Sequence, residues 1–181
     1  MRMDDLGLEL KFAGGAPVLT EDHVIEGYAS LFGVADQGGD IVAAGAYAAS
    51  LARLAARGDK VRMLWQHDPG QPIGIWEEIH EDGRGLWVRG RLLPEVAQAR
   101  EAAALIAAGA IDGLSIGYRT VRAERDREGR RVLTEVELWE VSLVTFPMLR
   151  EAKVGRKSED QGDEAGALAE ALRAASAALR G

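Results

Sequence analysis

Two stretches carry the clearest strand patterns in the sequence: GLSIGYRTV, residues 113–121, and VLTEVELWEVSLVT, residues 132–145. In both, apolar and polar residues alternate, as in strands with one face toward a core. A charged loop over 123–131 separates them. The pair predicts a β-rich fold in which strand alternation sets which side chains face one another.

Further strands and helices are predicted on both flanks. Strands are expected at 24–32, 61–67, 73–80 and 85–92, and helices at 44–57 and 95–108. The run Asp68-Pro69-Gly70 should stop the strand that ends at His67, because proline restrains its neighbour and glycine permits a turn. Residues 81–84 should form a hairpin turn. Many strands and few helices predict a barrel.

The composition changes after about residue 154. Residues 155–166 hold almost no large apolar side chains, and an Ala/Leu-rich stretch follows with Leu168, Leu172 and Leu179 on one stripe. We therefore expect residues 1–154 to form the main domain, and residues 155–181 to form a polar linker and a helix outside its core.

Charge and cysteine content exclude several classes of function. A net charge of -7 argues against a nucleic-acid partner, since such surfaces carry clustered Lys and Arg. The absence of cysteine excludes thiol catalysis and a cysteine-ligated zinc site. No apolar run approaches the roughly 18 residues of a membrane span. We expect a protein of the bacterial cytoplasm with protein partners and no membrane or nucleic-acid contact.

Ser115 is a candidate nucleophile because it lies between Gly113 and Gly117 with apolar residues on either side. Strand alternation places Leu114 and Ile116 on the opposite face. The glycines clear space through which a substrate backbone can approach. The same pattern is also typical of a small polar residue where a barrel strand bends.

A serine nucleophile needs an adjacent general base, most often histidine. Of the three histidines, His23 and His80 lie in polar surroundings, whereas His67 ends an apolar strand. His67 is therefore the candidate base, although a histidine that simply packs at a strand end would give the same pattern.

The base in turn needs a carboxylate to orient it. Glu140 is the candidate, because alternation places it on a largely apolar stripe with Leu138 and Ser142, where an unpaired carboxylate is costly. An ion pair with an arginine is the competing interpretation. Asp68 and Glu137 are weaker rivals.

No motif for a metal or cofactor accompanies these residues. The sequence has no HExxH pattern and no GxxxxGK[ST] or GxGxxG loop. We expect neither a cofactor nor a metal site.

Four segments, in order, resemble the prohead proteases of the HK97-like phage family: FGVADQGGDIVAAGAYAASL, LWQHD, AGAIDGLSIGYR and ELWEVSLVTFP. The resemblance covers about residues 20–154. It implies a closed β-barrel surrounded by helices, as in the herpesvirus assemblin proteases. It also implies a serine endopeptidase in which Ser115 is the nucleophile, His67 the base and Glu140 the third member.

By the same resemblance, the substrates are the scaffolding segment of the major capsid protein precursor and the protease itself. The enzyme would act inside the assembling prohead, and a homodimer is expected. Two alternatives stay open at this point: a non-catalytic internal assembly factor built on a protease-like barrel, and a hydrolase of small esters.

Overall fold

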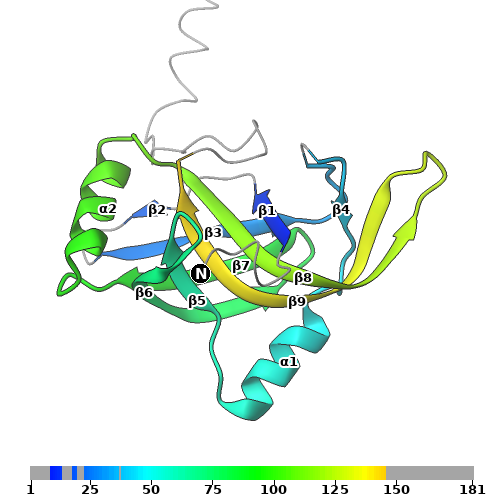
Figure 1. Cartoon of the computed structure of the whole chain (residues 1–181), viewed down its shortest axis with the longest axis horizontal. Coiled ribbons are helices and arrows are strands. Elements are labelled where there is room, and N and C mark those ends of the chain that lie inside the picture. The colour runs from blue at the N-terminus through cyan, green and yellow to red at the C-terminus, as the bar shows by residue number, and fades with distance from the viewer. Residues whose placement is uncertain (1–8, 14–17, 20–22, 37, 146–181) are drawn as a thin grey trace, which may run out of the picture.

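The computed structural model describes residues 9–13, 18–19, 23–36 and 38–145. These residues form nine strands and two helices (Figure 1). The strands are β1 (Glu9–Ala13), β2 (Val18–Leu19), β3 (Val24–Leu31), β4 (Ile41–Val42), β5 (Arg62–Trp65), β6 (Asp68–Glu81), β7 (Gly85–Leu92), β8 (Gly113–Arg125) and β9 (Arg131–Val144). The helices are α1 (Ala48–Arg57) and α2 (Ala97–Ala107).

All the strands belong to one mixed sheet that curls around the core (Figure 1). The order is β1-β8-β9-β5-β6-β7-β3-β2, with β4 also paired to β9. The β5–β9 and β4–β9 pairs are parallel, and the other pairs are antiparallel. The prediction of a mainly β fold with flanking helices is confirmed. The expected closure is not seen: in the described part of the chain the sheet is a half-barrel, since no pairing joins β1 to β2.

The core gathers apolar side chains from both helices and most strands. On β8 and β9 it takes one face only, the face of Leu114, Ile116, Tyr118, Leu138, Val141 and Leu143. The opposite face of the same two strands is free to carry polar groups. The candidate site lies on this opposite face.

The helix α1 packs against β9 and β6 and lies below the sheet in Figure 1. It begins later than predicted because Gly45 has φ +86°, a left-handed conformation that belongs to a turn. It ends where Gly58 adopts φ +68° and donates its N–H to the carbonyl of Ala55. The cap is the one expected from the sequence.

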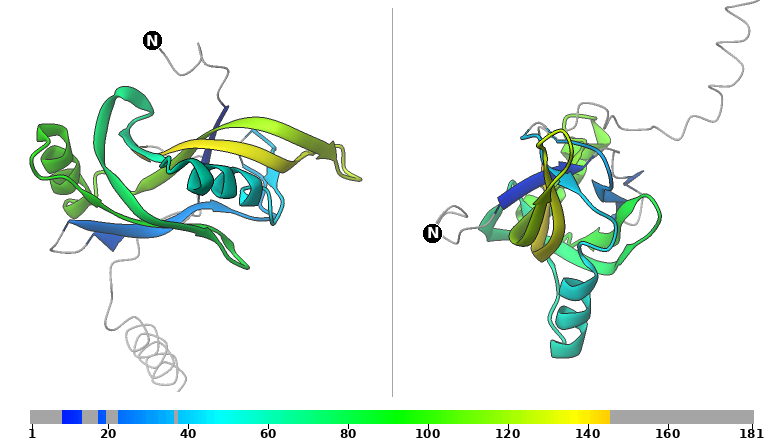
Figure 2. Two further views of the ribbon diagram at one scale, coloured as in Figure 1. Left: turned by 90° about the horizontal axis from the view of Figure 1, so that it is seen from below. Right: turned by 90° about the vertical axis from the view of Figure 1, so that its right-hand side faces the viewer.

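Two predicted strand ends are wrong. The strand β6 begins at Asp68 and includes Pro69 and Gly70, so these residues do not stop a strand. The predicted loop over 123–131 is shorter than expected, because β8 continues to Arg125 and β9 begins at Arg131; the hairpin turn between them carries the hydrogen bonds of Asp126 with Arg130 and Gly129. Figure 2 shows this hairpin extending beyond the rest of the sheet.

Candidate active site

A bulge in β9 turns Glu140 to the same face as Ser115. Leu138 lies opposite Tyr118, whereas Glu140 lies opposite Gly117, so Trp139 is an extra residue with no partner on β8 in this register. Because paired residues share a face, the bulge separates Glu140 from the core-facing Leu138. The prediction that these two share a face is therefore wrong, while Glu140 and Ser142 do share one.

His67 is carried by a tight turn between β5 and β6. Trp65 pairs with Asp68, which leaves Gln66 and His67 as a two-residue hairpin loop. Both have positive φ, 51° and 60°, as a type I′ turn requires. Neither is glycine, and a left-handed conformation costs such residues roughly 1–2 kcal/mol each. Surrounding contacts must hold the turn.

Those contacts come from the end of β9. The N–H of Gln66 donates to the carbonyl of Leu143 at 2.9 Å, and its side-chain amide donates to Thr145 Oγ1 at 2.6 Å. The N–H of His67 donates to Ser142 Oγ at 3.2 Å. The parallel pairing of β5 with β9 brings these segments side by side.

The structure brings Ser115, His67 and Glu140 into one hydrogen-bonded chain. Ser115 Oγ lies 2.6 Å from His67 Nε2, and His67 Nδ1 lies 2.6 Å from Glu140 Oε1. The side chains of His67 and Glu140 are 10% and 3% exposed. Ser115 is also buried, 0% exposed.

The arrangement sets the roles that each atom can take. A carboxylate accepts hydrogen bonds, so Nδ1 of His67 carries its proton toward Glu140. This leaves Nε2 as the acceptor for the Ser115 hydroxyl. The three groups can therefore move a proton from serine to histidine while the carboxylate stabilises the imidazolium.

Ser142 was not singled out from the sequence as functional, yet it joins this cluster. Its Oγ donates to Glu140 Oε2 at 2.5 Å, and it lies opposite Ser115 across β8 and β9. Its place on the same strand face as Glu140 was the available signal. Serine on a strand is too common for that signal to identify a role.

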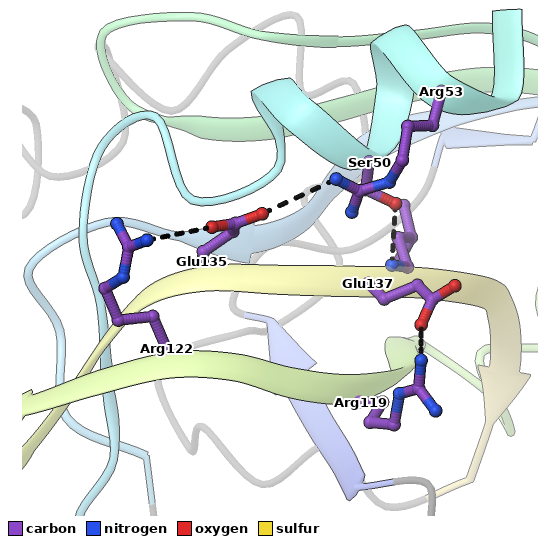
Figure 3. Close-up of polar contacts among 7 residues, drawn as sticks. Ser50, Arg53, Arg119, Arg122, Glu135 and Glu137 are labelled. Atoms are coloured by element: carbon purple, nitrogen blue, oxygen red, sulfur yellow. Dashed lines mark hydrogen bonds and ion pairs between the residues drawn. The ribbon is translucent and has the colours of Figure 1, made fainter.

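The rival carboxylates lie elsewhere. Glu137 forms an ion pair with Arg119, as Figure 3 shows. Asp68 accepts hydrogen bonds from the N–H of Gly70 and the side chain of Gln71 at the exposed start of β6. The structure places neither of them against His67.

The other histidines are also separate from Ser115. His80 lies 3.2 Å from Glu78, and its side chain is 47% exposed. His23 precedes β3, where its carbonyl accepts the N–H of Leu92. His67 is the histidine that contacts the candidate nucleophile.

A hollow of about 360 Å³ lies between α1 and β9, and its lining includes Arg57, Lys60 and Trp139 but none of the three candidate residues. Within residues 9–145, gaps excepted, no group of three potential metal ligands occurs. None of the helices described is long and apolar enough to cross a membrane.

Comparisons with known proteins agree with the geometry of this cluster. Residues 15–165 match the family described as Caudovirus prohead serine protease. The chain is 32% identical over 159 residues to the prohead protease of Enterobacteria phage HK97, a match that covers 86% of this chain and 68% of that protein.

A solved structure shares the fold. The bacteriophage T4 capsid assembly protease, gp21, superposes with a TM-score of 0.63 at 18% identity, covering 77% of this chain and 98% of gp21. The family match spans most of the sequence and includes all three candidate residues. This chain therefore belongs to the Caudovirus prohead serine protease family.

Proposed function

We propose that this protein is a serine endopeptidase that matures a prohead, with Ser115, His67 and Glu140 as its triad. The observation that carries the proposal is the unbroken chain of contacts from Ser115 through His67 to Glu140, at 2.6 Å each. Membership of a serine protease family supports it.

The reaction is acyl transfer in two halves. Ser115 Oγ attacks the peptide carbonyl carbon while His67 Nε2 takes the hydroxyl proton. The C–N bond then breaks, and His67 returns the proton to the leaving amine. Water attacks the acyl-serine in the same way, His67 accepts its proton, and the carboxylic acid leaves with Ser115 restored. Glu140 stays ionised throughout and holds the imidazole in place.

The substrates we propose are the scaffolding segment of the major capsid protein precursor and the protease itself. The enzyme would work inside the assembling prohead, where both are concentrated. The support is the family, whose relatives include the HK97 prohead protease.

The test is incubation of the purified full chain with capsid protein precursor, followed by mass spectrometry of the products. A fluorophosphonate probe, which reacts with activated serines, is added to a parallel sample. We expect cleavage of the precursor and labelling at Ser115, and Ser115→Ala should show neither.

Each alternative predicts another result. A non-catalytic assembly factor would neither cleave the precursor nor react with the probe. A small-ester hydrolase would be labelled and would hydrolyse a generic ester, but it would leave the precursor at full length. Either pattern would contradict the proposal.

A further inference from the structure

Ser142 is a buried hydroxyl that contacts both the proposed base and the proposed acid. It is 0% exposed and lies on β9, two residues beyond Glu140. The reaction described above does not use it: it is not part of the proton path from Ser115 to His67. Its contacts nevertheless involve two of the three residues of the triad.

The hydroxyl uses its donor and one acceptor position at once. Its O–H donates to Glu140 Oε2 at 2.5 Å, and its oxygen accepts the backbone N–H of His67 at 3.2 Å. Glu140 Oε1 accepts a hydrogen bond from Nδ1 of the same histidine. The contacts form a closed ring that runs from the His67 backbone through Ser142 and Glu140 to the His67 imidazole.

Both partners need such a contact. A carboxylate as buried as Glu140 requires a partner for each oxygen, and His67 supplies only one of them. Ser142 donates to the other oxygen, and a hydrogen bond to a carboxylate is roughly twice as strong as one between neutral groups. His67 has φ +60°, an unfavourable backbone conformation for a residue other than glycine, so surrounding contacts must stabilise it.

We propose that Ser142 is a positioning residue that fixes the rotamer of Glu140 and the turn that carries His67, so that Nε2 points at Ser115. The proposal rests on the function proposed above. It adds that the geometry of the base depends on a fourth side chain, which does not touch the substrate. Positioning contacts of this kind support functional side chains in many enzymes.

The test compares Ser142→Ala with a matched control, Ser50→Ala. Ser50 on α1 is also a buried serine, 1% exposed. Its Oγ accepts the N–H of Leu138 on β9, the strand that also carries Ser142 (Figure 3). Both variants lose a buried hydroxyl that bonds to a backbone N–H. Only Ser142→Ala loses a contact with Glu140.

The first measurement is hydrolysis of a synthetic peptide that spans a site cleaved by the wild-type enzyme, with the folded fraction determined by circular dichroism. We expect Ser142→Ala to lower kcat about 10- to 100-fold, as loss of an outer hydrogen-bond partner typically does, with KM changed less than about twofold. Ser50→Ala should keep its kcat. Ser142→Thr, which retains the hydroxyl, should recover most of the rate.

The second measurement does not need catalysis. The proton shared by His67 Nδ1 and Glu140 should give a low-field resonance in the ¹H NMR spectrum of the full chain. Ser142→Ala should shift or broaden it, Ser142→Thr should retain it, and Ser50→Ala should leave it in place. If Ser142→Thr does not fold, Ser142→Cys, a weaker donor, should give an intermediate effect.

The outcomes separate this inference from the proposed function. If Ser142→Ala loses no more rate than Ser50→Ala, or leaves the resonance unchanged, Ser142 has no positioning role. If the wild-type chain cleaves nothing, the proposed function fails, and the NMR comparison still decides whether Ser142 holds His67 and Glu140 together.

Discussion

In the proposed triad, Glu140 and His67 have different roles, and single substitutions should separate them. His67 would transfer the proton, whereas Glu140 would orient and stabilise the imidazole through its 2.6 Å contact with Nδ1. We expect His67→Ala to lower kcat on the order of 10⁶-fold and Glu140→Gln on the order of 10⁴-fold, as in other serine protease triads. Steady-state hydrolysis of a peptide substrate measures both.

The neighbouring Glu137→Gln is the matched control. It removes a carboxylate from the same strand, but one that pairs with Arg119. It should retain the wild-type rate. If Glu137→Gln or Asp68→Asn lost activity while Glu140→Gln kept it, the acid would have to be reassigned.

Ser115→Ala should abolish cleavage and leave the fold intact. The substitution removes one hydroxyl from a strand in which glycines lie two residues away on either side, so it creates little cavity. The lost hydrogen bond to His67 is worth about 1 kcal/mol. Thermal unfolding should show a small change in Tm, and the capsid precursor should stay at full length. Normal processing by folded Ser115→Ala would exclude this serine as the nucleophile.

Among the elements, α1 offers a test of its C-terminal cap. Gly58 has φ +68°, and a Cβ placed there would meet no atom within 4 Å, so only backbone strain opposes alanine. We expect Gly58→Ala to lower the free energy of unfolding by about 1 kcal/mol without changing kcat. Denaturant unfolding measures the first and peptide hydrolysis the second.

Gly83→Ala is the control for this change. Gly83 also has open space around its Cα, but its φ does not lie in the left-handed range. The variant should be as stable as the wild type. If both variants lost the same free energy of unfolding, the positive φ of Gly58 would not be the cause of its loss.

The turn between β6 and β7 should weaken in acid because of Asp82. Its carboxylate accepts hydrogen bonds from the hydroxyl of Tyr28 and from the N–H groups of Arg84 and Gly85, and these bonds lower the pKa of Asp82. A lowered folded-state pKa adds stability above the unfolded pKa of about 3.9, and this is lost as the pH falls through the folded value.

Asp82→Asn tests that dependence. The variant should be less stable than the wild type at pH 7, and the difference in Tm should shrink as the pH falls below about 4. Thermal unfolding followed from pH 7 to pH 2 measures it. A difference in Tm that stays constant over the whole range would show that the charge of Asp82 is not responsible.

The regular helices and strands could be predicted from the sequence, whereas the irregular backbone could not. Periodicity and caps were enough for α1, α2, β3, β7 and the central strands, because burial of one face imposes a regular pattern. The pattern breaks down at irregular backbone. The bulge at Trp139 carries no glycine, and Gln66-His67 lacks the Asn-Gly signature of a type I′ turn, so neither was predicted.

The residues of the candidate site could be chosen from the sequence, but their arrangement could not. His67 and Glu140 were chosen by chemistry, as a histidine and a carboxylate in apolar surroundings, and the structure brings both to Ser115. The reason given for the face of Glu140 was wrong because alternation cannot detect a bulge. Ser142 was missed because its role depends on contacts between segments that are distant in the sequence.

At the scale of the whole molecule, we predict that residues 155–181 are dispensable for peptide hydrolysis and direct the enzyme to the assembling shell. They lie outside the described residues, so the prediction rests on their polar, alanine-rich composition. A chain ending at Val154 should be soluble and should cleave the precursor in solution, but it should not be packaged in proheads. A gel of purified proheads checks packaging.

An insoluble or inactive product would contradict this prediction. It would show instead that the helix expected near the C-terminus packs against the protease domain itself. Retained activity together with normal packaging would show that residues 155–181 are dispensable for hydrolysis but do not direct the enzyme to the shell.

The parallel pairing of β5 with β9 also has a consequence for the newly made chain. His67 and Glu140 are 73 positions apart, and Ser115 is 48 positions from His67, so the cluster requires contacts that form slowly and late in folding. During synthesis, the strand that carries Glu140 and Ser142 is the last of the nine described strands to leave the ribosome. A partly synthesised chain thus has Ser115 and His67 but lacks Glu140, and if the proposed function holds, proteolysis should begin only when β9 has been added to the sheet.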